Sequence, residues 1–206
     1  MPTSETERLV EFDTGTLYEA AGEGAFPPGL RMLSGSGRIA GPALTVACPP
    51  GDNLAVHVAV AGAREGEVLV VQTHDRGCGV WGEVLTVAAM ARGIRALVID
   101  GSVRDLDAIR ELAFPVFGRG TALLGTGKRE AGSVREPVTC GGRLVHPGEL
   151  IVADLSGLVA IRAERVAEVL AAAAARRDKE AGMLRQLREG RTTIELLGLG
   201  DYIDRR

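Results

Sequence analysis

Lysine and cysteine are both scarce in this sequence. Only two of the 206 residues are lysines, Lys128 and Lys179, and the other basic charges are arginines. The three cysteines, Cys48, Cys78 and Cys140, are widely spaced and form no CxxC pair. This number and spacing argue against a disulfide framework or a zinc knuckle, and they are typical of reduced thiols in the cytoplasm.

Long apolar runs and net charge are also lacking. The longest mostly apolar stretch, residues 166–175, is alanine-rich and far shorter than the roughly 20 residues that span a bilayer. The first residues are polar and acidic, unlike a signal peptide. A net charge of −3 does not suggest a nucleic-acid or membrane-surface partner. We therefore expect a cytoplasmic protein with neither a membrane nor a nucleic-acid partner.

The composition that remains is that of a compact globular chain. Apolar residues make up 46% of the sequence and charged residues 25%. A chain of 206 residues can bury a core without disulfides, and this length suits one domain with an appended segment.

Hydrophobic patterning predicts alternating strands and helices in the middle of the chain. The predicted strands lie at residues 43–48, 68–72 and 96–100, and the predicted helices at 53–63, 82–92 and 105–112. Before them, a short helix capped by Thr14 leads into a loop at 24–42 that is rich in Gly, Pro and Ser.

Later segments predict hairpins and a final helix. Strands are expected near Val116, at 134–138 and at 150–152, followed by one long helix from 163 to 189. The whole order predicts an α/β core with a C-terminal helical extension. We place the core at residues 1–160 and the extension at 161–206.

Two glycine-rich segments resemble nucleotide-binding loops without matching them. Residues 125–128 read GTGK, but Ala122 replaces the first glycine of a phosphate loop and Arg129 its final Ser or Thr. Residues 35–41 approach a dinucleotide fingerprint, but no predicted strand precedes them. The histidines lack the spacing of a metal site, and we interpret His57, on a helix face, as structural.

Two other segments combine groups that bind an organic acid. Residues 82–85 (GEVL) begin a predicted helix, and residues 100–105 (DGSVRD) follow a buried strand. Ligands of open α/β sheets bind beyond strand C-termini and at helix N-termini, where free amides suit a carboxylate. The planar guanidinium of Arg104 suits a carboxylate or a developing enolate. Asp105 offers oxygen to Mg²⁺ or Mn²⁺, which would polarise a 2-oxo acid.

Each of these residues also has a structural interpretation. Asp105 could simply cap the helix that follows it, and Glu83 could complement the dipole of the helix that it begins. In the functional interpretation, Glu83 is a base that acts directly or through metal-bound water. The residues alone leave these alternatives open.

Further segments complete a resemblance to a known family. Residues 82–83 and 99–105 (IDGSVRD), together with RIAGPA at 38–43, DNL at 52–54 and PGELIVAD at 147–154, resemble in order the signature of the ribonuclease E regulator A family. The resemblance covers about residues 15–160. It implies a swivelling β/β/α domain that assembles as a homotrimer or as a dimer of trimers.

The family includes metal-dependent aldolases that act on 4-hydroxy-4-methyl-2-oxoglutarate or 4-carboxy-4-hydroxy-2-oxoadipate. Resemblance to this branch implies that Asp105 holds the divalent metal and that Arg104 binds the pyruvate unit. Glu83 would be linked to metal-bound water and would act with Arg104 in catalysis. Many members have Asp at the position of Glu83, and the extra methylene here moves the carboxylate outward.

The resemblance also implies how the substrate carboxylate is held. Gly82 and the amides of Val84 and Leu85 would bind it at the helix start. Glu180, in the helical extension, would approach the metal-bound water of a neighbouring subunit. Residues 75–81 are unusual for the family, and they are expected to influence which substrate is preferred.

The sequence therefore predicts a class II (metal-dependent) pyruvate aldolase with oxaloacetate decarboxylase side activity. The alternative is a non-catalytic regulator that binds and inhibits ribonuclease E, as other members of the family do. The predicted metal site and the extension around Glu180 favour the enzyme. A Schiff-base mechanism is disfavoured because Lys128 lies in a glycine-rich loop and Lys179 in a charged helix.

Overall fold

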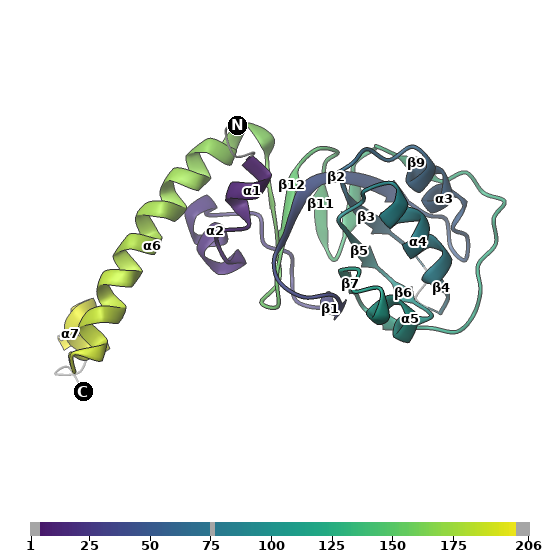
Figure 1. Cartoon of the computed structure of the whole chain (residues 1–206). Helices are drawn as coiled ribbons and strands as arrows, with labels where there is room; N and C mark the ends of the chain where they lie inside the picture. Colours follow the sequence, from purple (N-terminus) through teal and green to yellow (C-terminus); the bar gives the residue numbers. More distant parts are fainter. Residues whose placement is uncertain (1–4, 75–76, 201–206) are drawn as a thin grey trace.

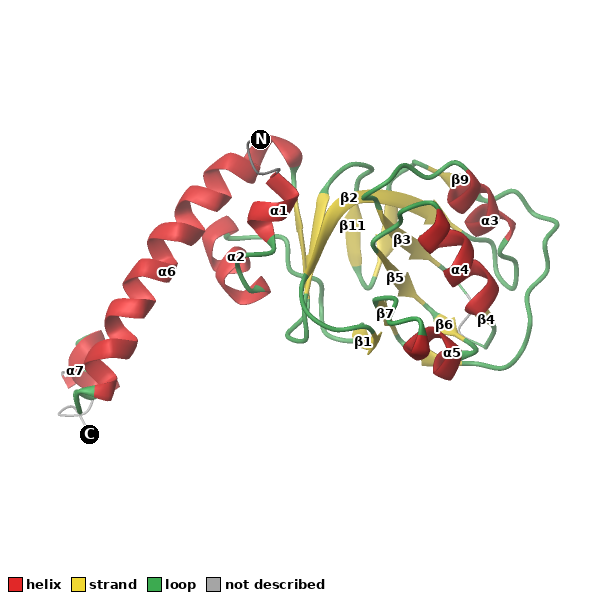
Figure 2. Ribbon diagram, viewed as in Figure 1, coloured by secondary structure: helices red, strands yellow, loops and turns green. Residues whose placement is uncertain are grey.

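The computed structural model of the chain describes residues 5–74 and 77–200. Its centre is a curled mixed sheet with the strand order β1-β7-β5-β3-β2-β12-β13, and β9 pairs with β2 (Figures 1 and 2). These strands are β1 (Arg31–Ser34), β2 (Ile39–Ala47), β3 (Val68–Gln72), β5 (Ala96–Asp100), β7 (Val116–Gly118), β9 (Ser133–Val134), β12 (Leu150–Ala153) and β13 (Leu158–Ile161).

Strands β2, β3, β5 and β7 run parallel, and helices connect them. The helices are α3 (Leu54–Ala61), α4 (Glu83–Ala91) and α5 (Leu106–Glu111). Successive strand side chains point to opposite faces, so Leu69 and Val71 pack toward these helices. Val68 and Val70 instead pack toward a hairpin formed by β10 (Val138–Cys140) and β11 (Arg143–Val145). The middle strands are therefore buried on both faces, as their unbroken apolar sequences require.

Strand β2 changes partner along its length. Its first residues pair antiparallel with β12, where Pro42 lies opposite Leu150. From Ala43 onward it pairs parallel with β3. At this change Gly41 passes so close to Gly66 that a Cβ would lie 2.3 Å from the Gly66 carbonyl oxygen. The glycine is thus needed for a close backbone approach.

A second, three-stranded parallel sheet lies at the carboxyl ends of β3, β5 and β7. It consists of β4 (Gly79–Trp81), β6 (Ser102–Val103) and β8 (Gly120–Thr121). Trp81 lies opposite Val103, and the Arg104 amide donates to the Trp81 carbonyl at 2.8 Å. This pairing brings residue 82 beside residues 104 and 105, although residue 82 lies more than twenty positions before them in the sequence.

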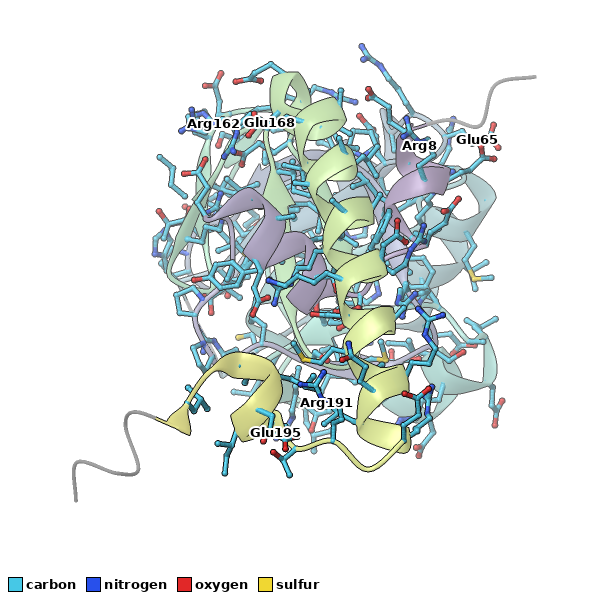
Figure 3. The ribbon with its side chains drawn as sticks, turned by 90° about the vertical axis from the view of Figure 1, so that its left-hand side faces the viewer. Arg8, Glu65, Arg162, Glu168, Arg191 and Glu195 are labelled. Carbon is cyan, nitrogen blue, oxygen red and sulfur yellow. The ribbon has the colours of Figure 1, made fainter. Side chains whose placement is uncertain are left out.

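The terminal helices form a separate layer on β12 and β13. They are α1 (Glu5–Leu9), α2 (Thr14–Ala21), a 3₁₀ turn (Ala163–Arg165), α6 (Val166–Arg188) and α7 (Thr193–Leu197). The first turns of α6 bury Val166, Val169 and Leu170 against α1 and α2. The rest of α6 extends away from the sheet and carries α7 at its end (Figure 1). Figure 3 shows the molecule from the side on which α6 lies. In this view α6 runs from top to bottom in front of the sheet, and Arg191 and Glu195 lie near its C-terminal end.

Several predicted elements agree with the structure. Strands 68–72 and 96–100 are confirmed with the same bounds, and the helices that follow the parallel strands are confirmed within two residues. The α/β fold with a C-terminal helix is also confirmed. No helix in the described ranges combines the length and apolarity needed to cross a membrane. The boundary at residue 160 stays a prediction.

Other local predictions are wrong for identifiable reasons. The segment 24–42 is not all loop, because it contains β1 and the start of β2. The single strand at 134–138 is in fact two strands, since Arg135 has a left-handed φ of 63° and Pro137 cannot donate to a ladder. The cap of α2 is Asp13, whose carboxylate accepts the Thr16 amide at 2.8 Å, and Thr14 is the first helical residue.

Candidate active site

A hollow of about 300 Å³ lies where α4 begins and β6 ends. Its walls come from the first turns of α3 and α4, from β4, from the turn between β6 and α5, and from the loop 125–128. The hollow therefore lies beyond the carboxyl ends of the parallel strands, where open α/β sheets bind ligands. Gly82, Val84, Leu85, Arg104 and Asp105 all line it.

Asp105 does not act as a helix cap, although it occupies the N-cap position of α5. Its side chain makes no capping hydrogen bond, and its φ of 54° lies in the left-handed region. The Oδ2 atom instead accepts the Glu83 amide at 3.3 Å and lies 3.4 Å from Nε of Arg104. The carboxylate thus faces the start of α4. The alternative that Asp105 caps its own helix, α5, is therefore wrong.

Gly82 permits this approach because it lacks a side chain. A Cβ at residue 82 would lie 2.5 Å from Oδ2 of Asp105 and 3.1 Å from Cγ of Arg104. The Gly82 backbone is extended, with φ of −156°, so its conformation alone would suit any residue. The constraint is therefore steric, and it comes from the side chains of Arg104 and Asp105.

The first turn of α4 presents free amides to the hollow. The Thr86 amide bonds the Gly82 carbonyl at 3.0 Å, which begins the intrahelical ladder. The Glu83 amide binds Asp105. Within the described residues, the amides of Val84 and Leu85 have no acceptor, as expected for the first turn of a helix. These two donors lie at the positive end of the helix dipole and suit an anion.

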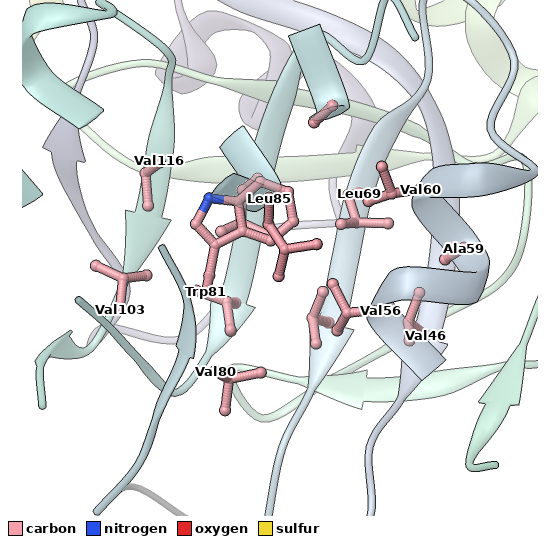
Figure 4. Close-up of a cluster of buried hydrophobic side chains, with 14 of the residues drawn as sticks. Val46, Val56, Ala59, Val60, Leu69, Val80, Trp81, Leu85, Val103 and Val116 are labelled. Carbon is pink, nitrogen blue, oxygen red and sulfur yellow. The ribbon is translucent and has the colours of Figure 1, made fainter. Parts of the chain in front are cut away.

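Trp81 fixes this helix start from beneath. It is 1% exposed, its indole Nε1 donates to Oγ1 of Thr86 at 2.7 Å, and its ring stacks on Phe114 with centroids 6.1 Å apart. The Thr86 hydroxyl in turn donates to the Gly82 carbonyl at 3.0 Å. Figure 4 shows Trp81 among Leu85, Val103 and other apolar side chains. The floor of the hollow is consequently rigid, which favours a preorganised site.

The hollow is also lined by residues that sequence reasoning missed. These are Asn53, His57, Thr126 and Lys128. The sequence predicts a structural role for His57 and no phosphate loop at 125–128, yet residues of both segments line the hollow. One sequence signal could have pointed to Asn53. The DNL segment at 52–54 is part of the family resemblance, but the resemblance assigns no role to Asn53.

Electrostatics around His57 follow from burial. Burial lowers the pKa of His57, and the nearby positive charge of Lys128 lowers it further. Its ring Nε2 is buried without a hydrogen-bond partner among the described residues, and so is Oδ1 of Asn53. Both effects favour the neutral ring of His57, whose nitrogens donate or accept depending on the tautomer.

Two predicted site residues lie outside the lining of the hollow. The Glu83 side chain is exposed and does not line it, although the Glu83 amide contacts Asp105. Glu180 is on α6, where its carboxylate lies 3.3 Å from Nε of Arg176. Helix α6 leaves the molecule on the side away from α4 (Figure 1). Within one chain, Glu180 therefore does not reach the hollow. Asp75 and Arg76, in the unusual segment 75–81, lie outside the described residues.

The donor set at Asp105 limits how a metal could be held. The described residues contain no cluster of three or more His, Cys, Asp or Glu side chains with metal-site geometry. A cage made only of side chains in one chain is thus not formed by these residues. Asp105 is 39% exposed and faces the hollow, which suits a hard cation that keeps most of its waters.

The chain is similar to known proteins over most of its length. The RraA-like family model, described as Aldolase/RraA, matches residues 14–160. A protein of Halalkalibacterium halodurans named "Putative 4-hydroxy-4-methyl-2-oxoglutarate aldolase" is 37% identical over 133 residues. That match covers 64% of this chain and 63% of the relative, so it spans less than two thirds of the relative's length.

Solved structures extend the likeness to the terminal helices. An uncharacterized protein from Pseudomonas syringae pv. tomato is 30% identical with a TM-score of 0.83, covering 93% of this chain and 92% of that one. Streptomyces coelicolor RraAS2, described as an unusual member of the RNase ES inhibitor RraA protein family, is 26% identical with a TM-score of 0.79, covering 87% and 94%. With the family match over residues 14–160, these likenesses establish that the chain belongs to the RraA-like family.

Proposed function

We propose that this protein is a class II pyruvate aldolase. It would cleave a 4-hydroxy-2-oxo-dicarboxylate of the 4-hydroxy-4-methyl-2-oxoglutarate type, with oxaloacetate decarboxylation as a side activity. The observation that carries the proposal is the position of the Asp105 carboxylate, which turns from its own helix to the start of α4 beside Arg104. The name of the Halalkalibacterium halodurans relative supports the same reaction class.

Arg104 and the start of α4 would bind the pyruvate half of the substrate. The guanidinium can donate two parallel hydrogen bonds to the 2-oxo acid, and the Val84 and Leu85 amides can donate to its carboxylate. As the bond between C3 and C4 breaks, negative charge develops on the C2 oxygen. Donors already fixed in place stabilise that charge without reorganisation.

Asp105 would hold Mg²⁺ or Mn²⁺, which retains several water ligands. When bound, the ion supplies Lewis-acid polarisation of the 2-oxo acid. The Glu83 side chain is exposed and does not line the hollow, and only its amide contacts Asp105. In this proposal its carboxylate turns toward the hollow, where it would hydrogen-bond a water of the ion or take the proton from the C4 hydroxyl. That proton transfer releases the ketone product, and a proton returned to C3 of the enolate gives pyruvate.

A second chain would complete the site. In this proposal, a homotrimer or a dimer of trimers places Glu180 of one chain near the Asp105 of its neighbour, where a carboxylate can orient bound water. The projection of α6 away from its own sheet is compatible with such an exchange (Figure 1).

The test is pyruvate release from a panel of 4-hydroxy-2-oxo acids, with Mg²⁺, with Mn²⁺ and after chelation. We expect release with either ion, loss in excess chelator and recovery when the ion is restored, because hard oxygen ligands favour these ions. Full activity in excess chelator would eliminate the metal role. No release from any member of the panel would eliminate the aldolase.

A second candidate function is regulation of an RNA-degrading enzyme. The likeness to Streptomyces coelicolor RraAS2, described as belonging to an RNase ES inhibitor family, favours it. Measuring ribonuclease E activity with and without this protein separates the two candidates. The aldolase proposal expects no inhibition when the two proteins are present in equal amounts.

A further inference from the structure

We infer that His57 is the base that takes the proton from the C4 hydroxyl group of the substrate and returns it to C3. The inference rests on the proposed aldol cleavage and deepens it by naming the residue that moves the proton. Glu83 would then act only on the waters of the ion. The basis is the set of side chains that line the hollow, together with the contacts that connect the start of α3 to β4 and to Arg104.

Four titratable side chains line the hollow among the described residues, and they are His57, Arg104, Asp105 and Lys128. Arginine and lysine side chains already carry their protons near neutral pH, so neither kind accepts another. Asp105 holds the ion in the proposed function, and its Oδ2 accepts the Glu83 amide. The Glu83 side chain itself does not line the hollow. The imidazole ring of His57 is therefore the remaining proton acceptor of this lining.

The His57 ring has an atom that is open to a substrate hydroxyl group. Its Nε2 is buried and has no hydrogen-bond partner among the described residues. A buried polar atom without a partner costs about 1–3 kcal/mol, so a ligand group that supplies a hydrogen bond is favoured beside it. A hydroxyl group can donate to the lone pair of this nitrogen. A general base must make this hydrogen bond before it takes the proton.

Asn53 fixes the start of α3 against β4. Its side-chain Nδ2 donates to the Val80 carbonyl at 2.8 Å, and Val80 lies two residues before Gly82 in the chain. The His57 amide donates to the Asn53 carbonyl at 3.3 Å, so His57 lies one helical turn further along α3. The Oδ1 of Asn53 is also buried and unpartnered among the described residues. Because residues four apart share a helix face, this oxygen can accept a hydrogen bond from the protonated ring.

A short loop links the guanidinium of Arg104 to the start of α3. A Cβ placed on Gly125 would lie 3.8 Å from Nη1 of Arg104, and the Gly127 carbonyl accepts the Asn53 amide at 3.1 Å. Two residues of fully extended chain span about 7 Å, so Gly125 and Gly127 lie no further apart than that. This span suits a substrate that binds Arg104 at its C2 oxygen and places its C4 hydroxyl, two carbon–carbon bonds further on, near His57.

The step balances in protons and electron pairs. The Nε2 of His57 takes the proton of the C4 hydroxyl, and the electron pair of the O–H bond forms the C4 carbonyl. The C3–C4 bond breaks, and its electron pair forms the C2–C3 double bond while the C2 oxygen becomes negatively charged beside Arg104. The imidazolium then gives its proton to C3. This transfer yields pyruvate and restores the neutral ring.

The surroundings of the ring favour its neutral, proton-accepting form. Burial lowers the pKa of His57 below its ordinary value of 6.5, and the charge of Lys128 lowers it further. Arg104 and Asp105 are the other charged groups that line the hollow among the described residues. The carboxylate of Asp52, just before α3, accepts two backbone amides. Activity should therefore fall as the pH falls through the pKa of His57, because the protonated ring cannot accept a proton.

The experiment measures cleavage of the best substrate of the panel, with Mg²⁺, by the wild type and by His57→Ala. We expect kcat to fall by about 100- to 1000-fold, as for the loss of a general base, with KM little changed. Added imidazole should restore part of kcat in a saturable manner, because a small base can occupy the vacated space and is a poor ligand for Mg²⁺. His146→Ala, at an exposed histidine outside the hollow, is the matched control and should keep the wild-type kcat with or without imidazole.

The pH profile gives a readout that a structural role of His57 would not move. In the wild type, the acid limb of kcat/KM should have the same apparent pKa as the His57 ring titrated by NMR, and His57→Gln should lack that limb. If circular dichroism shows that His57→Ala is unfolded, His57→Gln decides the outcome. Wild-type kcat in a folded His57 variant, or loss of the acid limb in Glu83→Gln instead, would overturn the base and leave the aldolase standing. Cleavage of no substrate by the wild type would overturn the aldolase and this step together.

Discussion

Arg104 and Asp105 are consecutive, yet both side chains face the start of α4. Two successive residues of a strand point to opposite sides, so an uninterrupted strand would separate them. The left-handed φ of Asp105 turns the chain just after β6 and brings its Oδ2 to 3.4 Å from the Arg104 Nε. Aspartate tolerates this conformation better than most residues, although it still costs about 1–3 kcal/mol. Strain of this kind is a feature of functional sites.

We predict that Arg104→Lys lowers kcat/KM by about 100- to 1000-fold, equivalent to about 2.7–4 kcal/mol by analogy with a lost oxyanion donor. A point charge cannot reproduce the planar fork of the guanidinium. Steady-state kinetics on the best substrate of the panel measure the effect, with circular dichroism as a check on folding. A folded variant that turns over at the wild-type rate would remove Arg104 from the reaction.

Gly82→Ala tests the steric argument at the same site. The new Cβ would lie 2.5 Å from Oδ2 of Asp105, so the carboxylate must move. We predict a loss of about 100-fold in kcat/KM, because a misplacement of about 1 Å is enough for such a loss. Gly120→Ala is the control, since no atom lies within 4 Å of a Cβ placed there. Equal kinetics for both variants would contradict the prediction.

At the scale of elements, hydrogen bonds to Asp154 join the N-terminal helices to the sheet. Its two carboxylate oxygens accept the Thr14 amide at 2.9 Å and the Thr14 hydroxyl at 2.7 Å, and Oδ1 also accepts the Ser156 amide at 2.8 Å. Burial alone would raise the pKa of Asp154, but these hydrogen bonds outweigh it and lower the pKa below the usual 3.8. Thr14 thus anchors α2 instead of capping it.

The depressed pKa gives this contact a pH dependence of known sign. Folding favours the ionised Asp154, so its contribution is complete above the unfolded pKa of about 3.9 and is lost as the pH falls through the lower folded value. We predict that Asp154→Asn loses about 2 kcal/mol of unfolding free energy at pH 7, and less near pH 3. Urea unfolding at both pH values measures this.

Asp178→Asn is the matched control, because Asp178 is exposed on α6. The control should change stability little at either pH. If Asp154→Asn lost as much unfolding free energy at pH 3 as at pH 7, the charge of the Asp154 carboxylate would not be the cause of the loss.

At the scale of the whole molecule, α6 is the element whose position needs explanation. Its first turns are buried against α1 and α2, whereas the residues from Arg177 to Ala181 are all exposed. Arg176 pairs with Glu19 of α2 and with Glu180. The monomer therefore uses only the first half of α6 for its own core.

We predict that Glu180→Ala and Asp105→Ala are each nearly inactive as purified proteins. When the two variants are mixed and their subunits are dissociated and reassembled, part of the activity should return. Some of the new interfaces would then pair an intact Asp105 with an intact Glu180. Glu189→Ala, at the exposed end of α6, is the control and should stay active alone. If Glu180→Ala alone were fully active, the shared site would be wrong and the extension would serve only the structure.

The fold class, the family and five of the residues that line the hollow could be predicted from the sequence: Gly82, Val84, Leu85, Arg104 and Asp105. The short apolar stretches at 68–71 and 96–99 favour buried strands, and the GEVL and DGSVRD segments contain their polar groups in consecutive residues. Such local patterns are readable because their physical cause lies within a few residues along the chain.

The direction of the Asp105 side chain and the presence of Asn53 and Lys128 in the hollow could not be predicted, because both depend on tertiary contacts. Whether Asp105 caps α5 or faces α4 depends on a left-handed turn and on the missing side chain of Gly82, twenty-three positions earlier. Asn53 and Lys128 meet across a long stretch of sequence because the loop 125–128 is hydrogen-bonded to the start of α3. Contacts between segments that are distant in sequence produce no periodic pattern of residues, so only the folded structure shows them.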